Sequence, residues 1–156
     1  MVTVTERVRF SETDMMGNAH HANHIRWFEC ARCAYLREAG VDLFELMDEG
    51  ILFPIKHVSC EYIDNIYFDD VIEIQARLTK LSRAQMVYGY RIVRQSDGHL
   101  LATGETQNVF THKATGKVAR DRNRMPNCWR CTKKTKQRNK QALFLSNCLF
   151  YMIKES

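Results

Sequence analysis

One stretch near the N terminus, residues 10–29, limits what this chain can fold into more than any other. A strand that ends at Phe10 is predicted by alternating apolar residues, namely Val2, Val4, Val8 and Phe10. A turn that carries Asp14 follows, and a long helix is predicted to begin near His21. The junction places a carboxylate beside a helix N terminus, where free backbone N–H groups and the helix dipole favour negative charge.

The helix is predicted to end at Ala39, with Gly40 as its stop. Its apolar residues fall in an arc of roughly 120° on a helical wheel, and they are Trp27, Phe28, Ala31, Ala34 and Tyr35. A short second helix is predicted over residues 42–49, capped by Asp42.

Residues 51–111 have the pattern of strands, interrupted at Ser82-Arg83 and at the hairpin signal Asp97-Gly98. This order of elements predicts an α+β fold, in which one antiparallel sheet packs against one long helix.

The length of 156 residues suggests one domain, and charge separates its last part from the rest. Residues 117–140 contain ten Lys or Arg and one Asp, which is a net charge of +9. The whole chain has a net charge of +5, so the remaining residues together carry −4. We expect a domain over residues 1–126 and a C-terminal extension over 127–156, first basic and then apolar. The apolar segment 142–153 is shorter than the roughly 20 residues of a membrane-spanning helix, so no membrane span is predicted.

The six cysteines occur without a recognisable secretion signal, which predicts reduced thiols and a cytoplasmic protein. The pair Cys128-x-x-Cys131 has no second pair of the same spacing, so chance is favoured over a zinc or redox site. No Gly-x-Ser-x-Gly motif is present, which argues against an α/β-hydrolase serine mechanism.

Asp14 is the main candidate for chemistry, because a base beside an oxyanion site is the minimum apparatus for hydrolysing an acyl bond. The alternative is an Asx-turn, in which Asp14 serves only the backbone. Glu12 could form a carboxylate pair with Asp14, although a solvated or salt-bridged role is favoured. The cluster His20, His21 and His24 suggests a metal site, but the adjacent pair points in different directions, so no metal is predicted.

The segment Thr13-Asp14-x-x-Gly17-x-x-x-His21-x-Asn23-x-x-x-Trp27-Phe28-Glu29-x-Ala31-Arg32 closely resembles the signature of hotdog-fold acyl-CoA thioesterases of the 4-hydroxybenzoyl-CoA thioesterase type. The resemblance covers roughly residues 3–126. It implies a sheet of about five strands around one central helix, no cofactor, and a homo-oligomer, either a dimer or a tetramer.

The resemblance also implies roles for individual residues. Asp14 is the expected catalytic carboxylate, either as the nucleophile or as the base that activates water. The backbone N–H groups of His21 and Ala22 are the expected oxyanion donors, and the His21 side chain is expected to orient the acyl group or water. Substrate contacts are expected at Gly17 in the turn, and at Ser82 and Arg83 near the nucleotide end of coenzyme A.

The function implied is hydrolysis of an acyl-CoA thioester. Two alternatives stay open, which are hydrolysis of acyl chains on an acyl carrier protein, and a non-catalytic acyl-CoA sensor whose basic tail binds nucleic acid. A carboxylate at position 14 favours the enzyme, since a sensor has no use for a charged group at the attacked carbon. Nucleic acid is therefore not favoured as a partner.

Overall fold

The computed structural model describes residues 1–82 and 84–119. The helices are α1 (His21–Glu38) and α2 (Leu43–Asp48), and a 3₁₀ turn, η1, covers Phe10–Glu12. The strands are β1 (Val2–Arg7), β2 (Ile51–Leu52), β3 (Ile55–Tyr62), β4 (Val71–Leu81), β5 (Gln85–Arg94), β6 (Leu100–Val109) and β7 (Thr111–His112). The expected Arg83 contact, the pair Cys128-x-x-Cys131 and the extension 127–156 lie outside the described residues.

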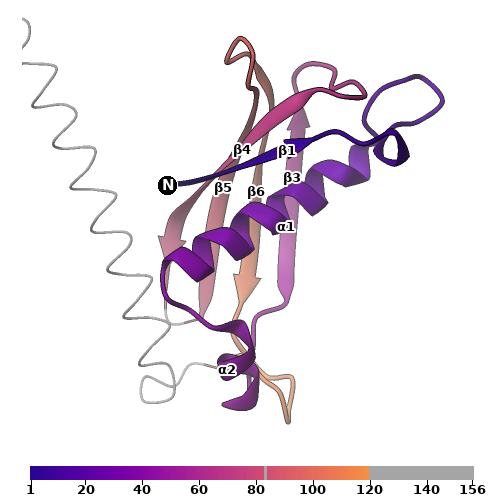
Figure 1. Cartoon of the computed structure of the whole chain (residues 1–156). Helices are drawn as coiled ribbons and strands as arrows, with labels where there is room; N and C mark the ends of the chain where they lie inside the picture. The colour runs from indigo at the N-terminus through magenta and orange to yellow at the C-terminus, as the bar shows by residue number, and fades with distance from the viewer. Residues whose placement is uncertain (83, 120–156) are drawn as a thin grey trace, which may run out of the picture.

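Five strands form one antiparallel sheet in the order β1-β4-β5-β6-β3, and β2 and β7 form a separate small pair. Helix α1 runs across one face of the five-stranded sheet, and α2 lies beyond the C-terminal end of α1 (Figure 1). The predicted α+β arrangement of one antiparallel sheet and one long helix is therefore confirmed. Among the described residues, no helix has the length and apolar content needed to cross a membrane.

Aromatic side chains join α1 to the sheet. The ring of Phe28 stacks on that of Tyr90 with centroids 4.4 Å apart, and Tyr35 meets Tyr88 edge-on at 5.4 Å. All four rings are buried, as is the alternating set Ile72, Ile74 and Ala76 on β4. Stacked and edge-on rings stabilise such contacts beyond the area they bury. The centre of the sheet is thus fixed against the middle of α1.

The predicted helix limits agree with the structure. Helix α1 begins at His21, its C-cap is Ala39, and Gly40 follows with φ of 72°. Asp42 caps α2 as predicted, because its Oδ1 accepts hydrogen bonds from the backbone N–H groups of Phe44 and Glu45. The end of α1 before Gly40 and the start of α2 after Asp42 therefore lie where local capping signals place them.

The predicted end of the first strand at Phe10 is wrong. Strand β1 stops at Arg7, and Phe10 lies in η1 with 77% of its surface exposed, although it shares the parity of the buried Val8. The Glu12 carboxylate accepts a hydrogen bond from the backbone N–H of Arg9, and this bond turns the chain before the alternation can continue.

Candidate active site

Asp14 lies in a short loop that leaves η1 and returns to the start of α1. Its backbone N–H donates to the carbonyl of Asn18 at 2.8 Å, and its Oδ1 accepts from the N–H of Met16 at 2.8 Å. Gly17, predicted as a substrate contact, closes the loop with φ of 80°, a conformation that suits glycine. The Asx-turn considered from the sequence is therefore present, but it uses only one carboxylate oxygen and leaves Oδ2 for other contacts.

The first turn of α1 presents the backbone donors expected for an oxyanion site. Within the described residues, the His21 N–H has no hydrogen-bond partner, as expected at a helix N terminus. The Ala22 N–H instead donates to Nδ1 of the cap residue His20 over a long 3.3 Å. The His21 side chain is exposed, and its ring lies 4.1 Å from that of His20. His21 is thus the better placed of the two expected donors.

The carboxylate of Glu12 is occupied by protein donors. Oε2 accepts from the Arg9 backbone N–H at 2.8 Å, and Oε1 accepts from the indole N–H of the buried Trp27 at 3.3 Å. A carboxylate that is hydrogen-bonded on both oxygens is poorly placed for proton transfer. The arrangement agrees with the non-catalytic role favoured for Glu12, through hydrogen bonds rather than a salt bridge.

Two further residues belong to this region: His24, which was considered from the sequence only within a histidine cluster, and Tyr62, which sequence reasoning missed. His24 is 4% exposed, and its ring lies 4.8 Å from that of Tyr62 and 5.2 Å from that of Trp27. Burial lowers the pKa of His24, although nearby backbone carbonyls oppose this effect, so the imidazole is neutral at pH 7. Tyr62 donates its hydroxyl to the carbonyl of His21 at 3.3 Å. No local signal in the sequence predicts that the end of β3 lies beside the first turn of α1.

The structure brings Asp14, Gly17, His21 and Ala22 to one end of the sheet, but it does not bring Ser82 there within one chain. Ser82 directly follows β4, and its hydroxyl accepts from the N–H groups of Ala84 and Gln85. The eleven residues of β4 span about 33 Å at 3.3 Å per residue, and the Asp14 loop lies near the other end of this strand.

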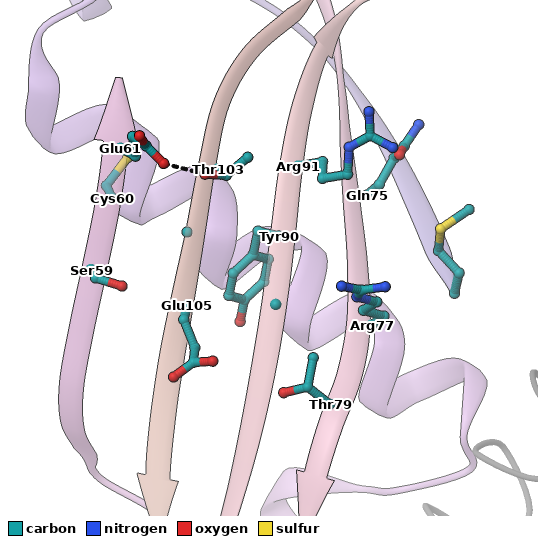
Figure 2. Close-up of a pocket in the computed structure, with 13 residues that line it drawn as sticks. Ser59, Cys60, Glu61, Gln75, Arg77, Thr79, Tyr90, Arg91, Thr103 and Glu105 are labelled. Atoms are coloured by element: carbon teal, nitrogen blue, oxygen red, sulfur yellow. Dashed lines mark hydrogen bonds between the residues drawn. The ribbon is translucent and has the colours of Figure 1, made fainter. Parts of the chain in front are cut away.

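A separate hollow of about 630 Å³ lies on the sheet face opposite α1. Figure 2 shows Arg77 and Arg91 on one side of this face and Glu61 and Glu105 on the other. None of the expected site residues lines this hollow. Among the described residues, no three His, Cys, Asp or Glu side chains come together as a metal site.

A single antiparallel sheet with one long helix across one face defines a hotdog fold, and the loop before this helix carries the Asp14 carboxylate. A family model described as the thioesterase-like superfamily matches residues 8–127. The chain belongs to this superfamily, and it is a thioester hydrolase.

Known proteins agree with this assignment. A putative esterase of Aquifex aeolicus is 36% identical over 89 residues, which make up 57% of this chain and 70% of that protein. A putative acyl-CoA thioesterase, YneP, of Bacillus subtilis is 25% identical over 83% of this chain and 94% of its own length. The crystal structure of a DHNA-CoA thioesterase from Staphylococcus aureus matches with a TM-score of 0.82 and 27% identity, covering 90% of this chain and 94% of that one. The predicted family and the hotdog fold are confirmed.

Proposed function

We propose that the chain hydrolyses acyl-CoA thioesters, with Asp14 as the catalytic carboxylate and the His21 backbone N–H as the oxyanion donor. One observation carries this proposal: the loop that carries Asp14 is tied at Glu12 to the cap of α1, through the His20 N–H, and the next residue, His21, has an N–H that no described group occupies. The names of several relatives, which are acyl-CoA thioesterases, support coenzyme A over an acyl carrier protein.

The chemistry needs few groups. Asp14 accepts a proton from water while the oxygen attacks the thioester carbonyl, or its own oxygen attacks to give an anhydride that water then opens. In both routes negative charge develops on the carbonyl oxygen, and the His21 N–H at the helix N terminus stabilises it. The C–S bond then breaks, and the thiolate leaves without strong acid assistance because a thiol has a pKa of about 8.5.

A thiol-release assay over a panel of aliphatic and aromatic acyl-CoAs tests the proposal directly. The same acyl groups on an acyl carrier protein form the comparison set. Turnover of at least one acyl-CoA, without added metal or cofactor, is the expected result. Failure to hydrolyse any member of the panel would refute the proposed function.

The oligomer expected from the sequence is proposed to form through β3. This strand is an edge of the five-stranded sheet, and all of its residues except the half-buried Cys60 are exposed. Ile55, Val58 and Tyr62 are among its exposed apolar side chains. An unpaired edge of this kind is a template for another strand, so we expect β3 to pair antiparallel with β3 of a second copy.

This pairing also accounts for the position of Ser82. A second copy paired antiparallel through β3 has its sheet running in the opposite direction. Its β4–β5 turn then lies at the same end of the assembly as the Asp14 loop of the first copy. The expected coenzyme A contacts at Ser82 and Arg83 are thus proposed to come from the partner subunit.

A tetramer is proposed to form from two such dimers through the sheet face shown in Figure 2. On this face, Arg77 and Arg91 lie on β4 and β5, whereas Glu105 and Glu61 lie on β6 and β3. Within the described residues neither arginine forms an ion pair. Both arginines are therefore available to pair with carboxylates of a second dimer.

Charge exchange tests the tetramer. Arg77→Glu with Arg91→Glu, or Glu61→Arg with Glu105→Arg, should each reduce the assembly to dimers by light scattering. Mixing the two variants should restore tetramers, because every contact then joins opposite charges. A mixture that stays dimeric would contradict this interface.

We also propose that residues 127–156 are an extension outside the catalytic domain, and that the protein is cytoplasmic. The family match ends at residue 127, which supports the first of these proposals. Relatives named as acyl-CoA thioesterases support the second, because coenzyme A esters are intracellular metabolites.

A further inference from the structure

Glu12 is the residue on which the Asp14 loop and helix α1 converge. Its backbone carbonyl accepts two hydrogen bonds of 2.7 Å, from the backbone N–H of His20 and from the side-chain amide of Asn23. Its carboxylate accepts two more, from the Arg9 backbone N–H and from the indole of Trp27. One residue therefore collects four donors from the strand exit, the helix cap and the buried face of α1.

These bonds directly connect the chain segments that carry the two groups of the proposed reaction, the Asp14 carboxylate and the His21 N–H. Asp14 follows Glu12 by two residues, and His21 follows His20 by one, so a single hydrogen bond between Glu12 and His20 links the carboxylate to the oxyanion donor. Asn23 and Trp27 are 5% and 3% exposed, so their bonds to Glu12 are shielded from water. Shielded hydrogen bonds of this kind fix geometry more firmly than exposed ones.

We propose that Glu12 is a positioning residue, which holds the Asp14 loop against the first turn of α1 and so sets the spacing between the Asp14 carboxylate and the His21 N–H. The proposal rests on the proposed function for its effect on turnover, but the hydrogen-bonded connection itself does not. Misplacement of reacting groups by about 1 Å can reduce a rate by about 100-fold. A residue that never contacts the substrate can therefore control kcat.

The carboxylate is the group that this position requires. Arg9 and Trp27 each donate to a different oxygen of Glu12, so both oxygens must be acceptors. A glutamine offers one acceptor oxygen and one NH₂ donor. Glu12→Gln would therefore place a donor against a donor at one of the two contacts, and the turn would shift to relieve it.

A double-mutant cycle between Glu12→Gln and Trp27→Phe tests the proposal, with kcat and KM measured separately. Glu12→Gln alone should lower kcat by about 10- to 100-fold and leave KM within about 3-fold. In the Trp27→Phe background the indole donor is absent, so the glutamine NH₂ meets a phenyl ring and its oxygen still accepts from Arg9. There, the same Glu12→Gln change should cost less than about 3-fold in kcat.

Two outcomes would overturn the proposal. An equal loss of kcat in both backgrounds would mean that the Glu12 charge itself takes part in the reaction. A lower melting temperature with unchanged kcat in the folded protein would mean that the bonds serve stability alone. Asp42→Asn is the matched control, since Asp42 is also a carboxylate that accepts backbone N–H groups but caps the distant α2. This control should change neither kcat nor KM.

Hydrogen exchange provides a test that needs no substrate. Asn23→Ala removes one donor to the Glu12 carbonyl and keeps the carboxylate, so it also serves if Glu12→Gln does not fold. Exchange of the amides in residues 13–21 should become at least about 10-fold faster in this variant, while exchange in β5 stays unchanged. Unchanged exchange in residues 13–21 would refute the connection. If the wild-type protein hydrolyses no thioester, the proposed function fails, yet this measurement still decides whether Glu12 holds the loop.

Discussion

Asp14→Asn is the most direct test of the proposed chemistry. The substitution keeps the shape of the side chain and its Oδ1, which can still accept from the Met16 N–H at 2.8 Å. It removes the charge that either attack or proton abstraction requires. The fold should therefore persist while the reaction is lost.

The size of each effect follows from the contacts. The hydrogen bond from Met16 changes from charge-assisted to neutral, which costs about 1 kcal/mol of unfolding free energy, or roughly 2–4 °C in melting temperature. Loss of a general base typically reduces turnover by about 100- to 10,000-fold, which corresponds to about 3–5 kcal/mol in activation free energy. The expected loss in catalysis thus exceeds the expected loss in stability.

The assay measures thiol release from the best acyl-CoA of the panel, with kcat and KM for wild type and variant, and circular dichroism for the fold. Asp42→Asn again serves as the control for replacing a capping carboxylate. A folded variant that keeps near-normal kcat would refute the assignment of Asp14 as the catalytic carboxylate, and a variant that unfolds would contradict the expectation that the fold persists.

Three further predictions concern stability and domain limits. Because burial lowers the pKa of His24, the unfolded chain binds a proton more readily than the folded one. The unfolding free energy should therefore fall as the pH drops below about 6.5. In urea titrations, His24→Phe should flatten this pH dependence. Gly104→Ala should destabilise the fold by about 1–3 kcal/mol, because the new Cβ would overlap the Phe28 ring and lie 2.6 Å from the Ser59 carbonyl. Gly89→Ala should cost less, because its new Cβ would have its closest contact with Thr79 Cγ2 at 3.1 Å. A chain ending at Pro126 should keep the kcat and oligomeric state of the full chain, and loss of kcat with an intact circular dichroism spectrum would move the domain boundary.

The elements that could be predicted from sequence are those with local causes. Helix α1 ends before Gly40, α2 begins after the cap residue Asp42, and the turn at Asp97-Gly98 follows from residues that favour it. The apolar arc of α1 was also recognisable, because its period depends only on helix geometry. Local chemistry therefore determines where these elements lie.

Features that depend on distant contacts could not be predicted in the same way. Arg32 is 6% exposed although a charged side chain favours water, and its closest ion-pair contact within the described residues is Glu29 at 3.7 Å. Tyr90, also buried, is close enough to Arg32 to sense its charge: burial raises the pKa of Tyr90, and the guanidinium of Arg32 opposes this rise. Such burial depends on which strand faces each turn of the helix, and this is a property of the assembled sheet.

Tyr62 connects the edge of the sheet to the site of the proposed reaction. It is the last residue of β3, and it donates to the carbonyl of His21, whose N–H is the proposed oxyanion donor. Burial and the neighbouring Cys60 raise the pKa of Tyr62, so its hydroxyl remains a protonated donor at neutral pH. Pairing of β3 with a second copy would restrict the motion of an otherwise exposed strand, and with it the position of Tyr62. Assembly and catalysis would then act on the same turn of α1, because the strand that forms the proposed interface also contacts His21, the proposed oxyanion donor.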